Sequence, residues 1–131
     1  MKLNHINLTS VDVPADVAMF EAYFGLRSSV VRKALAVLQD EQGMILVLND
    51  FAKKRGDFAY PEDSDIHHIG FIQDSRERVD ALNARLCADG WDVPPPRDYH
   101  GAWTFYFKAK GGYFIEVATE TQLSRDKRSA A

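Results

Sequence analysis

The sequence predicts an α+β fold made of two similar modules, because one motif occurs twice along the chain. Residues 2–8 read K-L-N-H-I-N-L, and residues 65–72 read D-I-H-H-I-G-F-I. When His5 is aligned with His68, the apolar residues around the two histidines also align. Each copy is followed by a helix pattern and then by a hairpin pattern. The predicted order is therefore a strand, a helix and two or three strands, twice over.

The first strand places its histidine on a defined face. Side chains alternate along a strand, so His5 and Asn7 share one face while Ile6 and Leu8 share the other. The second copy repeats this alternation around His68. Each module therefore offers one histidine at an equivalent position.

A helix is predicted next, from about Pro14 to Phe24. Asp12 accepts hydrogen bonds from the free N–H groups of the first turn, and Pro14 occupies a permitted first-turn position. Gly25 supplies the left-handed residue that ends many helices. The first module is completed by a strand around residues 28–32 and by a hairpin of residues 34–39 and 44–48.

The second module repeats this plan after an aperiodic linker, residues 49–64. Asp74 is the expected cap of its helix, with Glu77 three residues later and Gly90 at the end. Cys87 is expected on the buried side of this helix. The closing hairpin is predicted from residues 104–108 and 113–118.

The chain has the length of one domain, with 131 residues of which 46% are hydrophobic. We expect a single domain over residues 1–119, with module one at about 1–50 and module two at about 64–119. Residues 120–131 are polar and small, and are expected to form a frayed tail.

Composition excludes several classes of partner. A formal net charge of −3 with no basic face argues against nucleic acid, whose phosphates require clustered Lys and Arg. No apolar run is long enough to span a bilayer, and polar residues interrupt the N-terminal stretch where a signal peptide would lie. A single cysteine, Cys87, provides no disulfide framework. We expect a cytoplasmic protein.

The two hairpins also align, and the alignment singles out one carboxylate. If Gly43 corresponds to Gly112, then Glu116 corresponds to Val47. Alone, a glutamate in an apolar strand either faces solvent or occupies a cavity with a positive partner, and a lone strand histidine is more often structural than a ligand. Two matched histidines with this glutamate instead favour a set of metal ligands with open positions for water or substrate. The candidate ligands are His5, His68 and Glu116.

Three segments resemble the vicinal oxygen chelate superfamily, which includes glyoxalase I, type I extradiol dioxygenases, fosfomycin-resistance thiol transferases and bleomycin-resistance proteins. They are the L-N-H-I-N-L opening, the H-I-G-F strand and the F-Y-F-K-A-K-G-G-Y-F-I-E-V ending. The resemblance covers about residues 1–119. It implies two βαβββ modules whose curved mixed sheets enclose a cavity, with the helices outside.

The resemblance places the superfamily's metal positions on His5, His68 and Glu116, and a remaining position on Val47. Glyoxalase I enzymes typically have a carboxylate ligand at that remaining position, and valine cannot coordinate a metal. The ligand set is therefore more similar to the three-ligand thiol transferases and extradiol dioxygenases.

Two further residues are candidates for catalysis. His100 and Tyr106 lie where extradiol dioxygenases carry a histidine and a tyrosine that assist the reaction, and an imidazole can act as acid or base near neutral pH. His67 is not a candidate ligand, because alternation sends it to the face opposite His68.

The sequence thus predicts a metal-dependent enzyme of the lyase or isomerase, thiol transferase or dioxygenase type. It would bind a small oxygen-bearing substrate on a divalent ion of Fe, Mn, Ni, Co or Zn. The alternative is a non-catalytic protein that sequesters an antibiotic or metabolite, as bleomycin-resistance proteins do. A homodimer is expected, because each module leaves sheet edges open.

Overall fold

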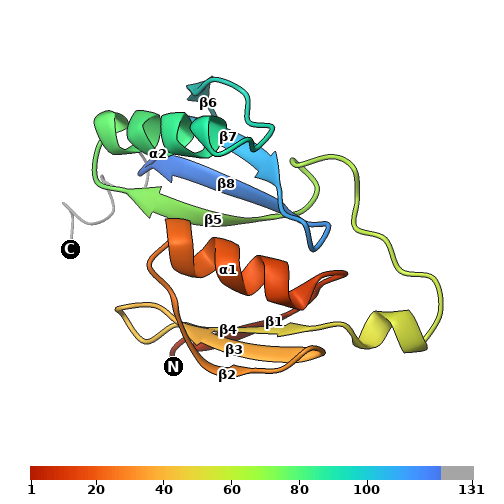
Figure 1. Cartoon of the computed structure of the whole chain (residues 1–131). Helices are drawn as coiled ribbons and strands as arrows, with labels where there is room; N and C mark the ends of the chain where they lie inside the picture. The colour runs from red at the N-terminus through yellow and green to blue at the C-terminus, as the bar shows by residue number, and fades with distance from the viewer. Residues whose placement is uncertain (122–131) are drawn as a thin grey trace. The chain divides into compact units, whose positions relative to one another are not determined.

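The computed structural model describes residues 1–121, which form two compact units (Figure 1). The first unit comprises Met1–Pro61 and Ala109–Tyr113, and the second comprises Glu62–Lys108 and the described residues from Phe114 to residue 121. Each unit contains one α-helix and one four-stranded mixed sheet. The predicted α+β fold of two βαβββ modules is confirmed.

The first sheet has the strand order β1-β4-β3-β2, in which β1 is parallel to β4 and the other pairs are antiparallel. A short 3-10 helix, Phe51–Lys54, follows it within the segment predicted as an aperiodic linker. The elements are β1 His5–Thr9, α1 Val13–Tyr23, β2 Arg27–Val31, β3 Leu35–Gln39 and β4 Ile45–Asn49.

The second sheet repeats this topology with the order β5-β8-β7-β6, and β5 is parallel to β8. Helix α2 packs against β5, β7 and β8 (Figure 1). The elements are β5 His68–Gln73, α2 Arg76–Ala88, β6 Arg97–Tyr99, β7 Ala102–Lys108 and β8 Phe114–Thr119.

In each unit one face of the sheet packs on the helix and builds the core, because alternation turns every second side chain toward it. In the first unit the buried side chains include Leu38, Leu48 and Phe20, each 0% exposed. In the second unit Ile115 and Val117 are also fully buried. The residues between them on each strand, which include the candidate ligands, therefore lie on the sheet face away from the helix.

The helix starts show one correct and one incorrect prediction. The Asp12 side chain accepts a hydrogen bond from the Ala15 N–H, as expected of a cap. The cap of α2 is Ser75 rather than Asp74, because the Ser75 hydroxyl accepts the bond from the Arg78 N–H. Both residue types are good caps, so spacing alone did not distinguish neighbouring positions.

The predicted burial of Cys87 is wrong, since this side chain is exposed. The buried face of α2 is formed by Val79, Leu82 and Leu86, and Cys87 lies about 100° further around the helix than Leu86. No helix in the described residues is long and apolar enough to cross a membrane. From residue 122 on, the predicted polar tail lies outside the described residues.

A buried carboxylate organises the first unit. Asp16 is 0% exposed, and its carboxylate accepts hydrogen bonds from the Ser10 hydroxyl at 2.7 Å, the Tyr113 hydroxyl at 2.8 Å and the Gly111 N–H at 3.0 Å. Burial raises the pKa of Asp16, and the three hydrogen bonds oppose this effect. The carboxylate thereby fixes the turn that precedes Tyr113 against the start of α1.

Candidate metal centre

Two of the three candidate ligands meet on the open face of the second sheet. In the parallel pair of β5 and β8, Glu116 lies opposite Gly70, two residues after His68. The Nε2 atom of His68 is 3.6 Å from Oε1 of Glu116. The His68 side chain is 31% exposed and that of Glu116 is 18% exposed, so an ion from solvent can reach both. The sequence repeat had predicted these two residues as ligands of one metal ion.

The orientation of the His68 ring is fixed by the backbone. Its Nδ1 atom lies 2.6 Å from the carbonyl oxygen of Ser64, and a carbonyl can only accept a hydrogen bond. Nδ1 therefore carries the proton, and in the neutral ring the lone pair is on Nε2. This lone pair belongs to the atom that approaches Glu116.

The Glu116 carboxylate is held by its sheet neighbours. The Thr104 hydroxyl, which is fully buried, lies 2.9 Å from Oε2 of Glu116 and 3.0 Å from the carbonyl oxygen of Val117. On the neighbouring strand, Gly70 has no side chain beside this carboxylate. A Cβ atom at position 70 would lie 3.4 Å from Oε1 of Glu116. One carboxylate oxygen is thus anchored, while the other faces His68.

Tyr106 completes this group, because β7 pairs it directly with Glu116. Its ring centroid is 5.1 Å from that of His68, in a T-shaped arrangement. Burial raises the pKa of Tyr106 above its ordinary value, and a hydrogen bond with Glu116 raises it further. The phenol therefore keeps its proton at neutral pH.

The donor set suits a metal ion. Metal bonds to imidazole nitrogen and carboxylate oxygen measure about 2.0–2.2 Å, so one ion can span donors up to about 4.2 Å apart. The 3.6 Å between His68 Nε2 and Glu116 Oε1 lies within this limit. Across residues 1–121, however, no three His, Cys, Asp or Glu side chains are grouped as a complete metal site. The described group therefore supplies two of the three predicted ligands.

The third predicted ligand, His5, belongs to the first unit. It lies at the start of β1, exposed, with Nδ1 3.3 Å from Oδ1 of Asn4. The strand register pairs His5 with Ile45 and Asn7 with Val47, so His5 and Val47 share the face away from α1.

His100 lies beyond the ligand pair, in the turn between β6 and β7, with a positive φ of 52°. Its ring centroid is 3.8 Å from that of Tyr99 with the two rings tilted by 54°, and its Nε2 atom is 3.7 Å from Oδ1 of Asp65. The Tyr99 ring is in turn 6.2 Å from the Tyr106 ring. Tyr106 thus lies next to the ligand pair, whereas His100 contacts Tyr99, which in turn lies near Tyr106.

Comparison with known proteins identifies the family. Residues 2–117 match the Glyoxalase/Bleomycin resistance protein/Dioxygenase superfamily. The chain belongs to this superfamily. No curated protein matches the sequence.

Several solved structures of the superfamily resemble the chain. One, described as a possible glyoxalase from Bacillus cereus, is 44% identical, with a TM-score of 0.79 over 90% of this chain and 98% of that one. Lactoylglutathione lyase from Agrobacterium tumefaciens is 21% identical, with a TM-score of 0.69 over 90% and 92%. The fosfomycin resistance protein FosX from Listeria monocytogenes, in complex with Mn(II) and sulfate, is 20% identical, with a TM-score of 0.72 over 98% and 97%. At 21% and 20% identity, the similarity to the last two structures shows a shared fold and not a shared activity.

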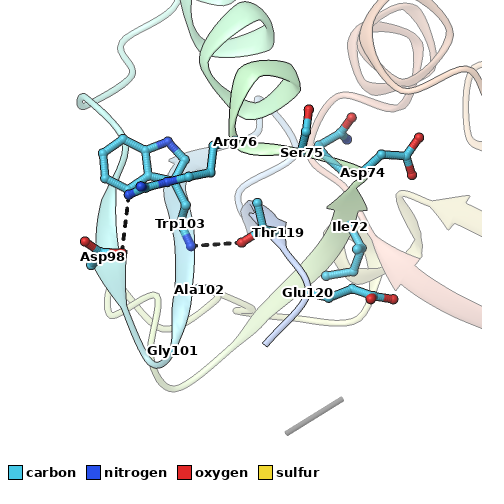
Figure 2. A pocket seen from close by; sticks show the side chains of 11 residues that line it. Ile72, Asp74, Ser75, Arg76, Asp98, Gly101, Ala102, Trp103, Thr119 and Glu120 are labelled. Carbon is cyan, nitrogen blue, oxygen red and sulfur yellow. Dashed lines mark hydrogen bonds and ion pairs between the residues drawn. The ribbon is translucent and has the colours of Figure 1, made fainter. Parts of the chain in front are cut away.

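A separate cavity of about 500 Å³ lies at one end of the second sheet (Figure 2). It is lined in part by Arg76, whose guanidinium lies 4.0 Å from the centre of the Trp103 ring and 3.5 Å from Oδ1 of Asp98. The backbone N–H of Trp103 donates to the Thr119 hydroxyl at 3.0 Å. These polar groups satisfy one another, and the cavity contains none of the predicted site residues. The candidate site of this superfamily member therefore remains the ligand pair on β5 and β8.

Sequence reasoning missed the groups that hold the ligands. Thr104 carried a usable signal, because it lies two residues before Tyr106 and thus shares its face. The Ser64 carbonyl carried none, since every residue has a backbone acceptor.

Proposed function

We propose that this superfamily member is a metal-dependent enzyme that binds a divalent ion through His68 and Glu116. The observation that carries the proposal is the approach of the His68 Nε2 lone pair to a carboxylate oxygen at 3.6 Å. Two acceptors at this distance repel each other unless a proton or a cation lies between them. His5 is proposed as the third ligand on the basis of the family resemblance.

The chain's own residues then have distinct roles. A bound divalent ion would supply positive charge that polarises a substrate oxygen. Ser64 and Thr104 hold the two ligands in the orientation that presents Nε2 and Oε1. Tyr106, kept protonated by its raised pKa, can donate a hydrogen bond to an oxygen on which negative charge develops.

His100 is proposed as a proton carrier between this group and solvent. Its side chain is 66% exposed, and the Tyr99 ring separates it from Tyr106. An exposed imidazole can exchange protons with water. This position suits proton delivery better than direct attack on a substrate.

The substrate class follows from the donor set. With few protein ligands, the ion keeps positions open for two oxygen atoms of a small molecule. The proposed reactions are those of the enzymes that the sequence resembles: isomerisation of a hemithioacetal, thiol addition to an epoxide, or oxygen-dependent cleavage of an aromatic ring at the bond next to two adjacent hydroxyl groups. Val47 favours the last two, which use three protein ligands.

A metal analysis tests the proposal. The protein is purified without chelator, and bound Fe, Mn, Ni, Co and Zn are measured beside the isosteric variant Glu116→Gln. We expect a substantial fraction of metal in the parent and little in the variant. The three reactions are then assayed with and without EDTA. Metal-free parent protein that still binds a small molecule tightly would favour the sequestering alternative.

A further inference from the structure

We propose that Asp65 is a positioning residue for His68, acting through the turn that carries the Ser64 carbonyl. The inference rests on the proposed role of His68 as a ligand. It concerns how the chain selects the His68 tautomer that leaves Nε2 free.

The Ser64 carbonyl belongs to a compact turn just before β5. The Asp65 N–H donates to Oδ1 of Asp63 at 2.8 Å, and the Ile66 N–H donates to the Asp63 carbonyl at 3.1 Å. These bonds shape the turn from within, but they do not fix its place over the sheet. A turn on the surface needs an external anchor to hold one carbonyl at 2.6 Å from a side chain.

Asp65 provides that anchor. The Tyr99 hydroxyl donates to its Oδ2 atom at 2.6 Å, and His100 Nε2 lies 3.7 Å from its Oδ1 atom. Tyr99 is itself restrained, because the Arg97 guanidinium lies 4.0 Å from the centre of its ring. A charge-assisted hydrogen bond of this length is among the stronger contacts available to a surface side chain. Asp65 thus ties the turn to β6, directly beside the Ser64 peptide.

A second contact holds the turn less directly. Glu62 forms an ion pair with Lys108 on β7, with Nζ to carboxylate oxygen distances of 3.1 and 3.2 Å. The Glu62 side chain is 79% exposed, and it is two residues from Ser64. Exposed ion pairs of this kind contribute little. Asp65 is therefore the contact expected to matter for His68.

Loss of the anchor should change the state of the His68 ring. Without a fixed carbonyl at Nδ1, the neutral imidazole can place its proton on Nε2 instead, which removes the lone pair that faces Glu116. Groups that contact a metal ligand typically change metal affinity by about 10–100-fold when removed. Asp65 acts one step further away, so we expect about a threefold to tenfold loss.

The test compares Asp65→Ala, Asp65→Asn and Asp98→Ala with the parent. Nitrogen NMR of the histidine rings in metal-free protein at pH 8, assigned with His68→Gln, reports the His68 tautomer. Zn(II) titration reports affinity. We expect Asp65→Ala to raise the fraction with the proton on Nε2 and to weaken Zn(II) binding. Asp65→Asn keeps an acceptor for Tyr99 and should remain near the parent. Asp98 is the matched control, because it is a carboxylate on β6 next to Tyr99 but pairs with Arg76 of α2 instead of with the turn.

The inference is overturned if Asp65→Ala retains the parent tautomer and the parent Zn(II) affinity, or if Asp98→Ala has the same effect as Asp65→Ala. Failure of the proposed function looks different. In that case the parent binds no Zn(II), whereas the NMR measurement still decides whether Asp65 fixes the His68 ring.

Discussion

Glu116 lies directly opposite Gly70 in the parallel pair of β5 and β8. In the first sheet, the parallel pair of β1 and β4 places Val47 opposite Asn7 in the same way. The two sheets therefore share one register, and a residue aligned by the sequence repeat occupies the same place in both. Val47 is thus the structural counterpart of Glu116, on the face that also carries the histidine of its own module.

Single substitutions in the ligand pair should strongly weaken metal binding. In His68→Ala the nitrogen donor is lost, and in Glu116→Gln the charge is lost, so either change should weaken divalent-ion binding at least 100-fold. Titration with Mn, Ni, Zn and Fe(II) checks this. His5→Ala tests the third ligand, which is proposed from the family resemblance. This variant should lose a similar factor in metal affinity.

His67→Ala is the matched control for these variants, because it removes an imidazole next to His68 that lies outside β5. It should bind metal like the parent. Loss of binding in this variant with retention in His68→Ala would show that the ligand assignment is off by one residue.

The protein should form a homodimer at micromolar concentration. β1 and β5 are edge strands of their sheets, and an open edge exposes unpaired N–H and C=O groups. Pairing between two copies satisfies such edges in a closed, symmetric way. Light scattering measures the mass in solution. A strictly monomeric mass across the working range would contradict the prediction.

Gly111→Ala should strongly destabilise the first unit. An added Cβ atom would overlap Oδ2 of Asp16 and lie 2.6 Å from the Ser10 hydroxyl, so the buried hydrogen bonds of Asp16 would break. Breaking a buried bond and overpacking each cost about 1–3 kcal/mol, which suggests a loss of about 3 kcal/mol or more in urea unfolding. Gly70→Ala is the control, since its Cβ atom meets nothing closer than 3.4 Å. An equal loss in both variants would refute the steric argument.

Asp16→Asn should destabilise the protein in a pH-dependent manner. The pKa of Asp16 is raised in the folded state, chiefly by burial, so the folded state holds its proton at pH values where the unfolded state has lost it. The stability that this group contributes is therefore greatest below the ordinary Asp pKa, and it falls as pH rises through the folded-state pKa. Asparagine does not ionise, so Asp16→Asn lacks this pH-dependent contribution to stability.

Urea unfolding of parent and Asp16→Asn between pH 4 and pH 7 measures the effect. Because an amide offers one acceptor oxygen to three donors, the variant should be less stable by about 1–3 kcal/mol at pH 4. This deficit should shrink toward pH 7. A deficit that grows with pH would mean that the hydrogen bonds outweigh burial and lower the pKa of Asp16.

The repeat explains why so much of the fold was predictable. Gly43 and Gly112 take φ values of 90° and 108° in equivalent turns, which only glycine adopts readily, and these turns set the strand register. Once the register is known, alternation decides which side chains share a face. The pairing of His68 with Glu116 followed from these two local rules.

What could not be predicted depends on contacts between distant segments. Asp65 meets Tyr99, 34 residues later, and Asp16 meets Tyr113, 97 residues later, and neither pair has a local pattern. The exposure of Cys87 was missed for a related reason, since the width of the buried face of α2 depends on the sheet beneath it. Such tertiary contacts carry no periodic signal in one sequence.

The last prediction concerns Val47, the counterpart of Glu116 in the first sheet. It is half-buried between Asn7 and Val37 on the neighbouring strands, on the face that also carries His5. Valine cannot coordinate a metal, so the position stays open to water or substrate. Val47→Glu would add a carboxylate at the position that the family resemblance aligns with the fourth ligand of glyoxalase I enzymes.

A half-buried carboxylate in the apolar strand β4 is costly unless a cation meets it. We therefore expect Val47→Glu to be less stable than the parent without metal, by about 1–3 kcal/mol, and to recover more stability when metal is added. It should also bind metal more tightly and gain slight isomerisation of a glutathione hemithioacetal. Thermal unfolding of both proteins, with and without saturating metal, is the measurement, and Val47→Gln controls for size without charge. A metal-induced shift in Val47→Glu equal to or smaller than that of the parent would place Val47 away from the ion.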